Sequence, residues 1–500
     1  MQIRGPVRHD GLDRQSRTAT GHGRVPAVRR LRAAVDGRVI TPGDAGYDRA
    51  RSLFYGGADR RPAVIVRPAG PSDVSQVVSL ARETGLELAV RGGRHSLAGH
   101  GTTDGGIVLD LADMNALEID PERRTAWAQT GLTAGAYTTA AGAYGLATGF
   151  GDTGSVGIGG ITLGGGIGYL VRKHGLTIDD LLAADLVTAE GQLLHVDDRS
   201  HPDLFWAIRG GGGNFGVATR FKFRLHPLDT IVGGLLLLPA TPEVIAGFVA
   251  EAQAAPEELS TIANVMPAPP LPFVPTEHHG RLVIMATLAY AGAVEAGQRA
   301  VAPFRALATP IADLVRPMPY PEIYPPDQGG FPLAPAWHTM FVDAVDGDAT
   351  QAIVEHLEAS AAPVRFVQLR VLGGAMARVP AEATAFAHRK RRIMVALGAV
   401  YEHREEEAVH ETWVTGFAAA LGRADAGVYV NFLGDEGEGR VREAYPGSTW
   451  ERLAAIKGRY DPTNLFHLNQ NIAPAIEGRK TEQKETSDGG EGAGGAEKEP

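Results

Sequence analysis

The sequence contains no cysteine among its 500 residues, and this absence excludes several kinds of chemistry. Disulfides, thiolate metal sites, iron–sulfur clusters and cysteine nucleophiles all require a thiol. No apolar run reaches the roughly 20 residues that a membrane-spanning helix needs, and the net charge of −10 provides no basic surface for nucleic acid. We therefore expect a cytoplasmic protein that binds neither membrane nor nucleic acid.

Several catalytic motifs are also missing. No HExxH or other metal-ligand spacing occurs, so no metal site is predicted, and no GxxxxGK[ST] sequence is present to form a P-loop. The segment nearest to a GxSxG nucleophile elbow is Thr153–Gly157, which begins with threonine in place of the first glycine. Metal-dependent, P-loop and serine-hydrolase chemistry therefore receive no support.

Glycine is abundant, with 64 residues concentrated between about positions 91 and 216. Three clusters, Arg91–Gly93, Gly157–Gly168 and Gly210–Gly216, expose peptide N–H groups that can line a phosphate or a planar ring. Apolar residues such as Ile158 and Phe215 alternate with these glycines, whereas flexible linkers lack such anchors. The clusters are therefore predicted to be ordered binding loops.

The segment Gly211–Gly216 satisfies the GxGxxG expression of dinucleotide-binding folds. That motif requires a strand before it and a helix after it, so that the helix N-terminus meets the pyrophosphate. Here residues 203–209 have a helical pattern and residues 217–225 alternate like a strand. The order is reversed, which argues against a Rossmann site.

His95 is the histidine whose surroundings point to a ligand. A predicted strand over residues 86–90 leads directly into Arg91-Gly92-Gly93-Arg94-His95-Ser96, where a side chain can meet a molecule held by the loop. His403 and His410 lie in a highly charged helical segment, and we expect them to be solvated.

The chain divides by composition. Residues 1–34 are predicted to be a disordered basic leader, and residues 477–500, rich in glycine, glutamate and lysine, a disordered tail. Residues 64–66 are expected to form a strand, followed by a helix with Ser72 as N-cap and Gly85 at its end. From about residue 230 the character changes to proline-rich loops between helices and strands, typical of a second α+β domain.

Taken together, these segments resemble the berberine bridge enzyme family of FAD-linked oxidases, within the vanillyl-alcohol oxidase and p-cresol methylhydroxylase superfamily. The resemblance covers about residues 35–474 and is nearest to bacterial secondary-metabolism oxidases such as the enterocin-pathway flavoprotein. It is carried by residues 61–65, 91–96, 157–168, 172–176, 203–207, 210–216, 429–432 and 461–466.

The resemblance implies an α+β fold with a two-part FAD-binding domain of the p-cresol methylhydroxylase type and an inserted antiparallel-sheet substrate domain. The expected boundaries are 35–228 for the FAD-binding domain, 229–455 for the substrate domain and 456–476 for a C-terminal return to the FAD-binding domain.

The resemblance also implies FAD bonded covalently to His95. Many relatives add a second bond from a cysteine, but Thr153 occupies that position here, so His95 is expected to be the sole attachment. Arg94 replaces a third glycine of many relatives. The predicted cofactor-binding residues are His95, Arg91, Gly92, Gly93, Arg94, Ser96, Thr153, Val156, Gly157, Gly160, Gly165, Gly213, Gly216, Val217 and Asn469.

A flavin carries the redox chemistry, while the protein supplies a base and orients the substrate. Tyr429, with Asn431 two residues later on the same side of an extended segment, is the leading candidate for that base or for a group that orients the substrate. The alternative is that Tyr429 only packs its ring. Gln368 aligns with a glutamate of the enterocin-type relative and cannot act as a base. Tyr144, Tyr169 and His174 are further candidates for the pocket.

The predicted function is oxidation of a small alcohol, sugar or polyketide-like compound, with hydride transfer to the flavin. Gly151 lies where relatives control oxygen access, and a small residue there indicates molecular oxygen as acceptor. Val156 replaces a threonine of the enterocin-type enzyme, so its oxygen-transferring chemistry is not expected. Two alternatives remain: a dehydrogenase or oxidative cyclase with another acceptor, and a flavin-binding protein without catalysis.

Overall fold

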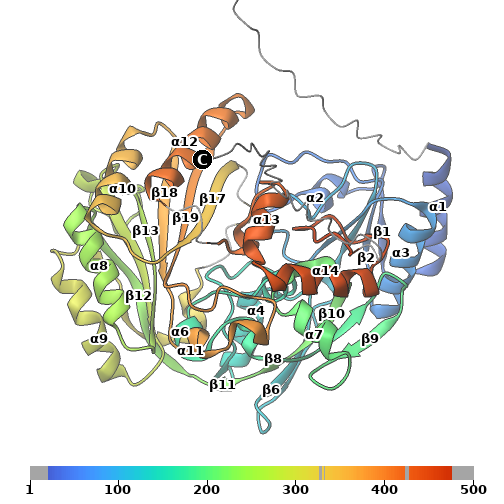
Figure 1. Cartoon of the computed structure of the whole chain (residues 1–500), viewed down its shortest axis with the longest axis horizontal. Helices are drawn as coiled ribbons and strands as arrows, with labels where there is room; N and C mark the ends of the chain where they lie inside the picture. Colours follow the sequence, from blue (N-terminus) through green and yellow to red (C-terminus); the bar gives the residue numbers. More distant parts are fainter. Residues whose placement is uncertain (1–20, 326–328, 331–332, 423–426, 476–500) are drawn as a thin grey trace, which may run out of the picture.

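The computed structural model describes residues 21–325, 329–330, 333–422 and 427–475. Figure 1 shows two parts side by side: one built on a large antiparallel sheet, and the other on two smaller sheets from the first half of the chain. Helices pack against sheets that are mainly antiparallel, so the predicted α+β class is confirmed. The predicted boundaries of the FAD-binding and substrate domains stay predictions.

The first small sheet forms because residues 64–110 contain short, fully apolar runs that are buried on both faces. Its strand order is β1 (Arg38–Ile40), β2 (Val64–Arg67), β4 (Ile107–Asp110) and β3 (Leu88–Arg91). Strand β4 pairs in parallel with both β2 and β3, and β1 pairs antiparallel with β2. The carboxyl end of β3 delivers residues 91–96 to the middle of the molecule. Helices of this part are α1 (Gly21–Ala34), α2 (Tyr47–Arg51) and α3 (Pro71–Thr84).

The second small sheet is antiparallel throughout, in the order β5 (Leu117–Asp120), β6 (Thr125–Gln129), β10 (Val217–Arg224), β8 (Leu181–Val187) and β9 (Leu193–Val196). A two-stranded ribbon joins β7 (Leu146–Ala147) to β11 (His226–Pro227). The helices here are α4 (Ala134–Gly142), α5 (Ile158–Leu163), α6 (Val171–His174) and α7 (Pro202–Ile208), with a 3-10 turn, η3, at Gly212–Asn214. Helix α7 precedes the last glycine cluster and β10 follows it, which confirms that the segment is not a Rossmann motif.

The large sheet has eight strands in the order β15 (Ala312–Asp313), β12 (Thr230–Pro239), β14 (Leu282–Tyr290), β13 (Leu259–Pro267), β18 (Val364–Val371), β19 (Ile393–Tyr401) and β17 (Ala334–Val342), with β16 (Arg316–Pro319) also paired to β12. Its pairings are antiparallel. Side chains alternate across each strand, so successive residues of β18 face opposite sides.

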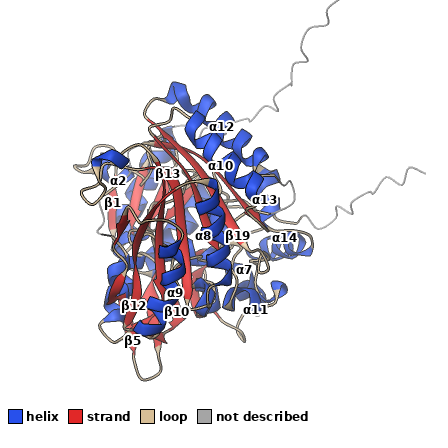
Figure 2. Ribbon diagram, turned by 90° about the vertical axis from the view of Figure 1, so that its left-hand side faces the viewer, coloured by secondary structure: helices blue, strands red, loops and turns tan. Residues whose placement is uncertain are grey.

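Helices α8 (Pro242–Ala254), α9 (Val294–Ala306), α10 (Gly347–Ala359) and α12 (Glu407–Ala420) cover one face of this sheet, as Figure 2 shows from the front. Their apolar residues, including Phe248, Phe304 and Phe417, join the sheet in one buried cluster. The opposite face of β13, β17, β18 and β19 turns toward the glycine-rich loops. One short helix, α11 (Ala375–Arg378), lies between β18 and β19.

The last described helices, α13 (Glu438–Ala444) and α14 (Ser448–Tyr460), lie against the second small sheet and α7 (Figure 1). In α14 the fully buried Lys457 ammonium lies 2.5 Å from the Asp461 carboxylate and donates to the carbonyl of Asn214, 2.8 Å away. The Asn214 side chain in turn accepts from the backbone N–H of Ile472. The chain between residues 457 and 472 thus fixes the turn of the third glycine cluster.

Two predictions about local structure are wrong. Residues 21–34 form helix α1 instead of a disordered leader, because Leu31 is buried and Arg30 forms an ion pair with Glu83 of α3. The N-cap of α3 is Gly70 instead of Ser72, because Pro71 occupies the first helical position, where its missing N–H costs nothing. Gly85 ends α3 with φ 66°, as predicted. Residues 1–20 and the predicted tail at 477–500 lie outside the described residues.

None of the helices in the described ranges combines the length and the apolar character needed to cross a membrane. The predicted cytoplasmic location stays a prediction.

Candidate functional site

A cavity of about 630 Å³, called here the main cavity, lies between the glycine-rich loops and the large sheet. One side, the glycine wall, is formed by residues 90–97, 151–163 and 212–218. The opposite side, the sheet wall, is formed by side chains from β13, β17, β18 and β19. Segments 429–433 and 469–470 also border the cavity. The glycine wall, the sheet wall and these two segments, which are distant from one another in the sequence, therefore meet at one concave site.

Most of the predicted site residues line the main cavity. They are Arg91, Gly92, Gly93, Arg94, His95, Ser96, Thr153, Val156, Gly157, Gly160, Gly213, Gly216, Val217, Gln368, Tyr429, Asn431 and Asn469. Gly165 is not on the surface of the cavity and lies beneath it, packed against Phe386 and Tyr429 with φ 130°. The roles assigned to these residues stay predictions.

Two glycines of the glycine wall are needed because two backbones touch. A Cβ atom at Gly93 would lie 2.1 Å from the Gly157 nitrogen, and one at Gly157 would lie 2.3 Å from the Gly93 nitrogen. Real Cβ atoms do not approach backbone so closely, so any side chain would push the two loops apart. This contact joins the loop after β3 to the loop before α5.

His95 projects from the first of these loops after a residue with unusual backbone geometry. Arg94 has φ 65°, a left-handed conformation that costs a residue with a side chain about 1 kcal/mol and glycine almost nothing. The arginine thus keeps the loop shape that glycine would adopt with less strain. The His95 ring stacks on Phe54, with centroids 3.8 Å apart, and its Nε2 lies 3.1 Å from the Ser155 hydroxyl. The ring is therefore oriented by Phe54, which follows α2, and by Ser155 in the loop before α5.

Arg91 contributes less charge to the cavity than its position indicates. Its guanidinium lies 3.0 Å from the buried carboxylate of Asp110 and also donates to the carbonyl of Ala50. Burial lowers the pKa of Arg91, and the charge of Asp110 opposes that shift. The side chain thus anchors the end of β3 through its ion pair.

Tyr429 is almost fully buried in the floor of the cavity, and three N–H groups converge on its hydroxyl oxygen. The backbone N–H groups of Gly166 and Ile167 donate from 2.9 and 3.2 Å, and the side-chain amide of Asn431 donates from 2.9 Å. Asn431 fits because Gly164 has no side chain: a Cβ there would lie 2.0 Å from its Oδ1. Three donors at one phenolic oxygen favour the phenolate over the neutral phenol.

Two effects oppose each other at this hydroxyl. Burial raises the pKa of Tyr429 above its usual 10, and the three N–H donors and the Arg370 charge pull that pKa down. The interpretation that Tyr429 only packs its ring does not account for this arrangement of donors. Its pKa stays raised on balance, so an additional positive or hydrogen-bonding group would be needed to ionise it near neutrality.

Arg370 organises the polar side of the cavity, a role that no sequence motif indicates. It extends from β18 with only 3% of its side chain exposed. Its Nη2 lies 2.5 Å from Asp152 Oδ2, its Nη1 donates to the carbonyl of Ile167 at 3.2 Å, and its Nε donates to Gln368 Oε1 at 2.8 Å. Gln368 in turn donates to Asn264 Oδ1 at 3.0 Å. The network connects the large sheet to the glycine wall.

The other candidates from the sequence lie elsewhere. Tyr144 is 56% exposed and does not line the cavity. Tyr169 is buried and donates to the carbonyl of Asp152, supporting the cavity from below. His174 stacks on His226, with ring centroids 3.8 Å apart. The prediction that His410 is solvated is wrong: its ring is buried against Tyr401, because this face of α12 packs on the large sheet. His403 is exposed.

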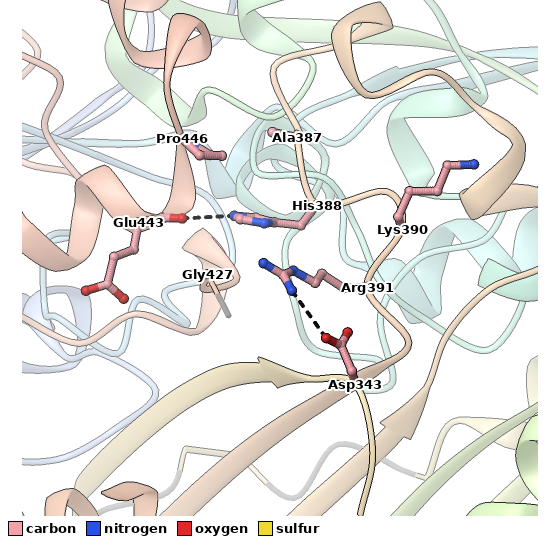
Figure 3. A pocket seen from close by; sticks show the side chains of 8 residues that line it. All are labelled: Asp343, Ala387, His388, Lys390, Arg391, Gly427, Glu443 and Pro446. Carbon is pink, nitrogen blue, oxygen red and sulfur yellow. Dashed lines mark hydrogen bonds and ion pairs between the residues drawn. The ribbon is translucent and has the colours of Figure 1, made fainter. Parts of the chain in front are cut away.

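A second cavity, of about 550 Å³, is lined by residues that include Gly427, His388 and Glu443 (Figure 3). The His388 side chain is directed toward α13 and donates to the carbonyl of Glu443 at 2.9 Å, while Arg391 points to Asp343 (Figure 3). Burial lowers the pKa of His388 to about 4, so the ring is neutral at pH 7. This cavity holds none of the predicted site residues, and we place the site in the main cavity.

The residues of the main cavity fit a flavin dinucleotide. The glycine wall offers backbone N–H groups with no side chains in the way, as phosphates and a flat ring require. On the opposite border, the side-chain oxygen of Asn469 is buried without a partner among the described residues. His100 also lines the cavity, and burial lowers its pKa to about 4, so it is a neutral hydrogen-bonding group.

Comparisons with known proteins agree with this geometry. Residues 62–197 match the FAD binding domain family, and residues 428–473 match the family of berberine and berberine-like proteins. The chain is 30% identical over 463 residues to (R)-6-hydroxynicotine oxidase of Paenarthrobacter nicotinovorans, covering 88% of this chain and 97% of that protein.

Solved structures show the same fold. The crystal structure of 6-hydroxy-D-nicotine oxidase from Arthrobacter nicotinovorans has a TM-score of 0.79 and 27% identity, and the match covers 88% of this chain and 98% of that one. Glucooligosaccharide oxidase from Acremonium strictum, described with a 6-S-cysteinyl, 8α-N1-histidyl FAD, has a TM-score of 0.77 and 23% identity, covering 90% and 99%. At that identity the second likeness concerns the fold alone.

The chain belongs to the berberine bridge enzyme-like family of FAD-linked oxidoreductases. It has the p-cresol methylhydroxylase-type fold that the sequence predicted, and it is an FAD-linked oxidoreductase.

Proposed function

We propose that this protein is an oxidase that removes a hydride from a small organic substrate, holds its FAD through His95 alone, and uses molecular oxygen as acceptor. The observation that carries the proposal is the meeting of His95, the glycine wall and the Tyr429 oxygen in one cavity. In this proposal residues 35–228 and 456–476 bind the cofactor and residues 229–455 provide the substrate side.

The covalent bond to His95 is supported by the way its ring is held. Phe54 fixes the plane of the imidazole and Ser155 engages Nε2, so the ring meets the cavity in a defined orientation. Thr153 occupies the place of the second attachment in other family members, and its hydroxyl donates to Asp152 instead. A hydroxyl is a far weaker nucleophile than a thiolate at neutral pH, so a second bond is not expected.

Bound FAD would supply the acceptor for a hydride, and the protein must remove a proton from the substrate. Tyr429 is the base in this proposal. The N–H groups of Gly166, Ile167 and Asn431 would stabilise its phenolate at this buried position. Gln368 cannot take a proton, and its contacts with Asn264 and Arg370 assign it an orienting role.

Access for oxygen is consistent with Gly151. A Cβ there would lie 2.7 Å from the Ile161 side chain, so a larger residue would fill the space between the loop and α5. Val156, also on the glycine wall, provides no hydroxyl at the position where the enterocin-type enzyme has threonine. The proposal is therefore oxidation with release of hydrogen peroxide, without oxygen transfer to the substrate.

Acid precipitation tests the attachment. Yellow colour should remain in the pellet of the wild-type protein, and His95→Ala should release all flavin to the supernatant. His403→Ala, which removes an exposed imidazole outside the cavity, is the matched control and should retain the colour. Covalent flavin in the His95→Ala protein would contradict the assignment.

Peroxide measured under air during turnover tests the acceptor. Turnover with no peroxide would favour a dehydrogenase or oxidative cyclase with another acceptor. Failure of every substrate to bleach the flavin anaerobically would favour a binding protein without catalysis.

A further inference from the structure

The charged side chain of the sheet wall, Arg370, is already bonded to other residues and does not provide a free charge for a substrate. Asp152 is the one carboxylate among the described residues that line the main cavity, and it is engaged by Arg370 and Thr153. The guanidinium of Arg370 is itself engaged at all three nitrogens, by Asp152, Ile167 and Gln368. At the sheet wall a substrate ammonium or carboxylate would have no free counter-charge beside it, which is unfavourable, because Arg94, a further cation that lines the cavity, lies on the glycine wall.

The rest of the sheet wall is mostly apolar and aromatic. Met266, Pro335, Trp337, Val364, Phe366 and Val400 come from four strands and face the cavity. Trp337 meets Phe366 and Phe432 at angles of 66° and 80°, with ring centroids 5.4 and 5.6 Å apart, the edge-to-face arrangement that aromatic rings prefer. The Phe366 ring lies directly over Gly398, where a Cβ would be 2.4 Å from the ring. The aromatic surface is thus fixed before any ligand binds.

One polar group on this wall lacks a partner. The indole Nε1 of Trp337 is buried and makes no hydrogen bond in the described structure. A buried N–H without an acceptor is costly, so a bound molecule whose acceptor reaches this nitrogen would gain affinity. The amides of Gln368 and Asn264 are bonded to each other, which leaves few groups to satisfy the many hydroxyls of a sugar chain.

From these three observations we infer that the main cavity takes an uncharged aromatic compound that carries a hydrogen-bond acceptor, such as an aromatic alcohol. The inference rests on the proposed function, because it assigns the sheet wall to the substrate. The inference therefore excludes a basic amine and an oligosaccharide as the preferred substrate of this cavity. The aromatic ring would stack against the fixed side chains and its oxygen would accept from Trp337.

A series of matched probes tests the charge. The flavin absorbance of the holoprotein is titrated anaerobically at pH 7 with benzyl alcohol, benzylamine, benzoate and xylobiose. Benzyl alcohol should bind at least tenfold more tightly than each of the others, seen as a spectral shift or as bleaching. Tighter binding of benzylamine, benzoate or xylobiose, or no response to benzyl alcohol up to its solubility limit, would overturn the inference.

A pair of variants tests the indole. Trp337→Phe keeps an aromatic ring and removes the N–H. It should weaken the binding of benzyl alcohol about fivefold to tenfold, whereas the affinity for toluene, which has no acceptor, should change by less than about twofold. Trp413→Phe is the matched control, since its Nε1 donates to the carbonyl of His356 on the covered face of the sheet. If Trp337→Phe reduced the affinity for both ligands equally, the proposed role of the N–H would be contradicted.

The outcomes separate the two proposals. A protein that retains acid-stable flavin through His95 but binds benzylamine best leaves the proposed function standing and removes this inference. A protein without His95-bound flavin fails the proposed function, and its ligand preference is then measured by calorimetry with the same probes.

Discussion

The glycine wall and the sheet wall of the main cavity differ in the groups they present. The glycine wall presents backbone, and its shape depends on positions such as Gly93 and Gly157 where no side chain fits. The sheet wall presents side chains from four strands, and the backbone beneath them is a regular antiparallel sheet. A cofactor shared by a whole family suits the first kind of surface, and a substrate that varies between relatives suits the second, because strand side chains change without altering the sheet.

Of the substitutions considered, Gly157→Ala should have the largest effect, which is a loss of folding stability. Its Cβ would lie 2.3 Å from the Gly93 nitrogen, so the two loops must separate, at a cost on the order of 3 kcal/mol in the free energy of unfolding. The free energy of unfolding measured in urea and the content of acid-stable flavin should both fall. Gly416→Ala is the control, because nothing described lies within 4 Å of its Cβ, it lies in α12 outside the cavity, and alanine favours a helix. Equal stability of the two variants would show that the glycine wall does not depend on this contact.

Tyr429→Phe should have the next largest effect, because it removes the proposed base and leaves the ring. We expect kcat to fall by about 10²- to 10⁴-fold with flavin content unchanged. Because burial raises the pKa of Tyr429, wild-type kcat/KM should increase with pH on the alkaline side, and the variant should lose this increase. Tyr445→Phe, also buried but bonded to the carbonyl of Gly210 outside the cavity, is the control. An unchanged alkaline limb in Tyr429→Phe would assign the base elsewhere.

The smallest effect concerns His388, in the segment that supports the sheet wall next to Tyr429. Its folded-state pKa is about 4, whereas the unfolded chain takes up the proton near pH 6.5. The unfolded state therefore binds more protons between these values, and stability falls as the pH decreases from 6.5 to 4, by at most about 1.4 kcal/mol per pH unit. His388→Gln should reduce this slope in urea unfolding between pH 7 and pH 5. The exposed His403→Gln should leave it unchanged, and equal slopes in all three proteins would refute the assignment.

The sequence predicted the glycine wall better than the sheet wall, for a physical reason. Residues 91–96 form one contiguous stretch, and their glycines report the close approach directly. Arg370, Asp152 and Trp337 acquire their roles only when strands more than a hundred positions from the glycine loops fold against them, and each type is common in ordinary strands and loops. Gln368 was identified only through the family resemblance. His410 was assigned to solvent because the charge of its neighbours does not reveal which face of α12 packs on Tyr401.

The contacts of Lys457 and Ile472 with Asn214 also make one part of the glycine wall depend on residues that are synthesised late. The third glycine cluster is held by residues about 250 positions later in the chain, so its turn lacks these bonds while the ribosome is still adding the second half. A chain cut before residue 457 would lack both of these bonds, so the turn of the third glycine cluster would lose the contacts that hold it.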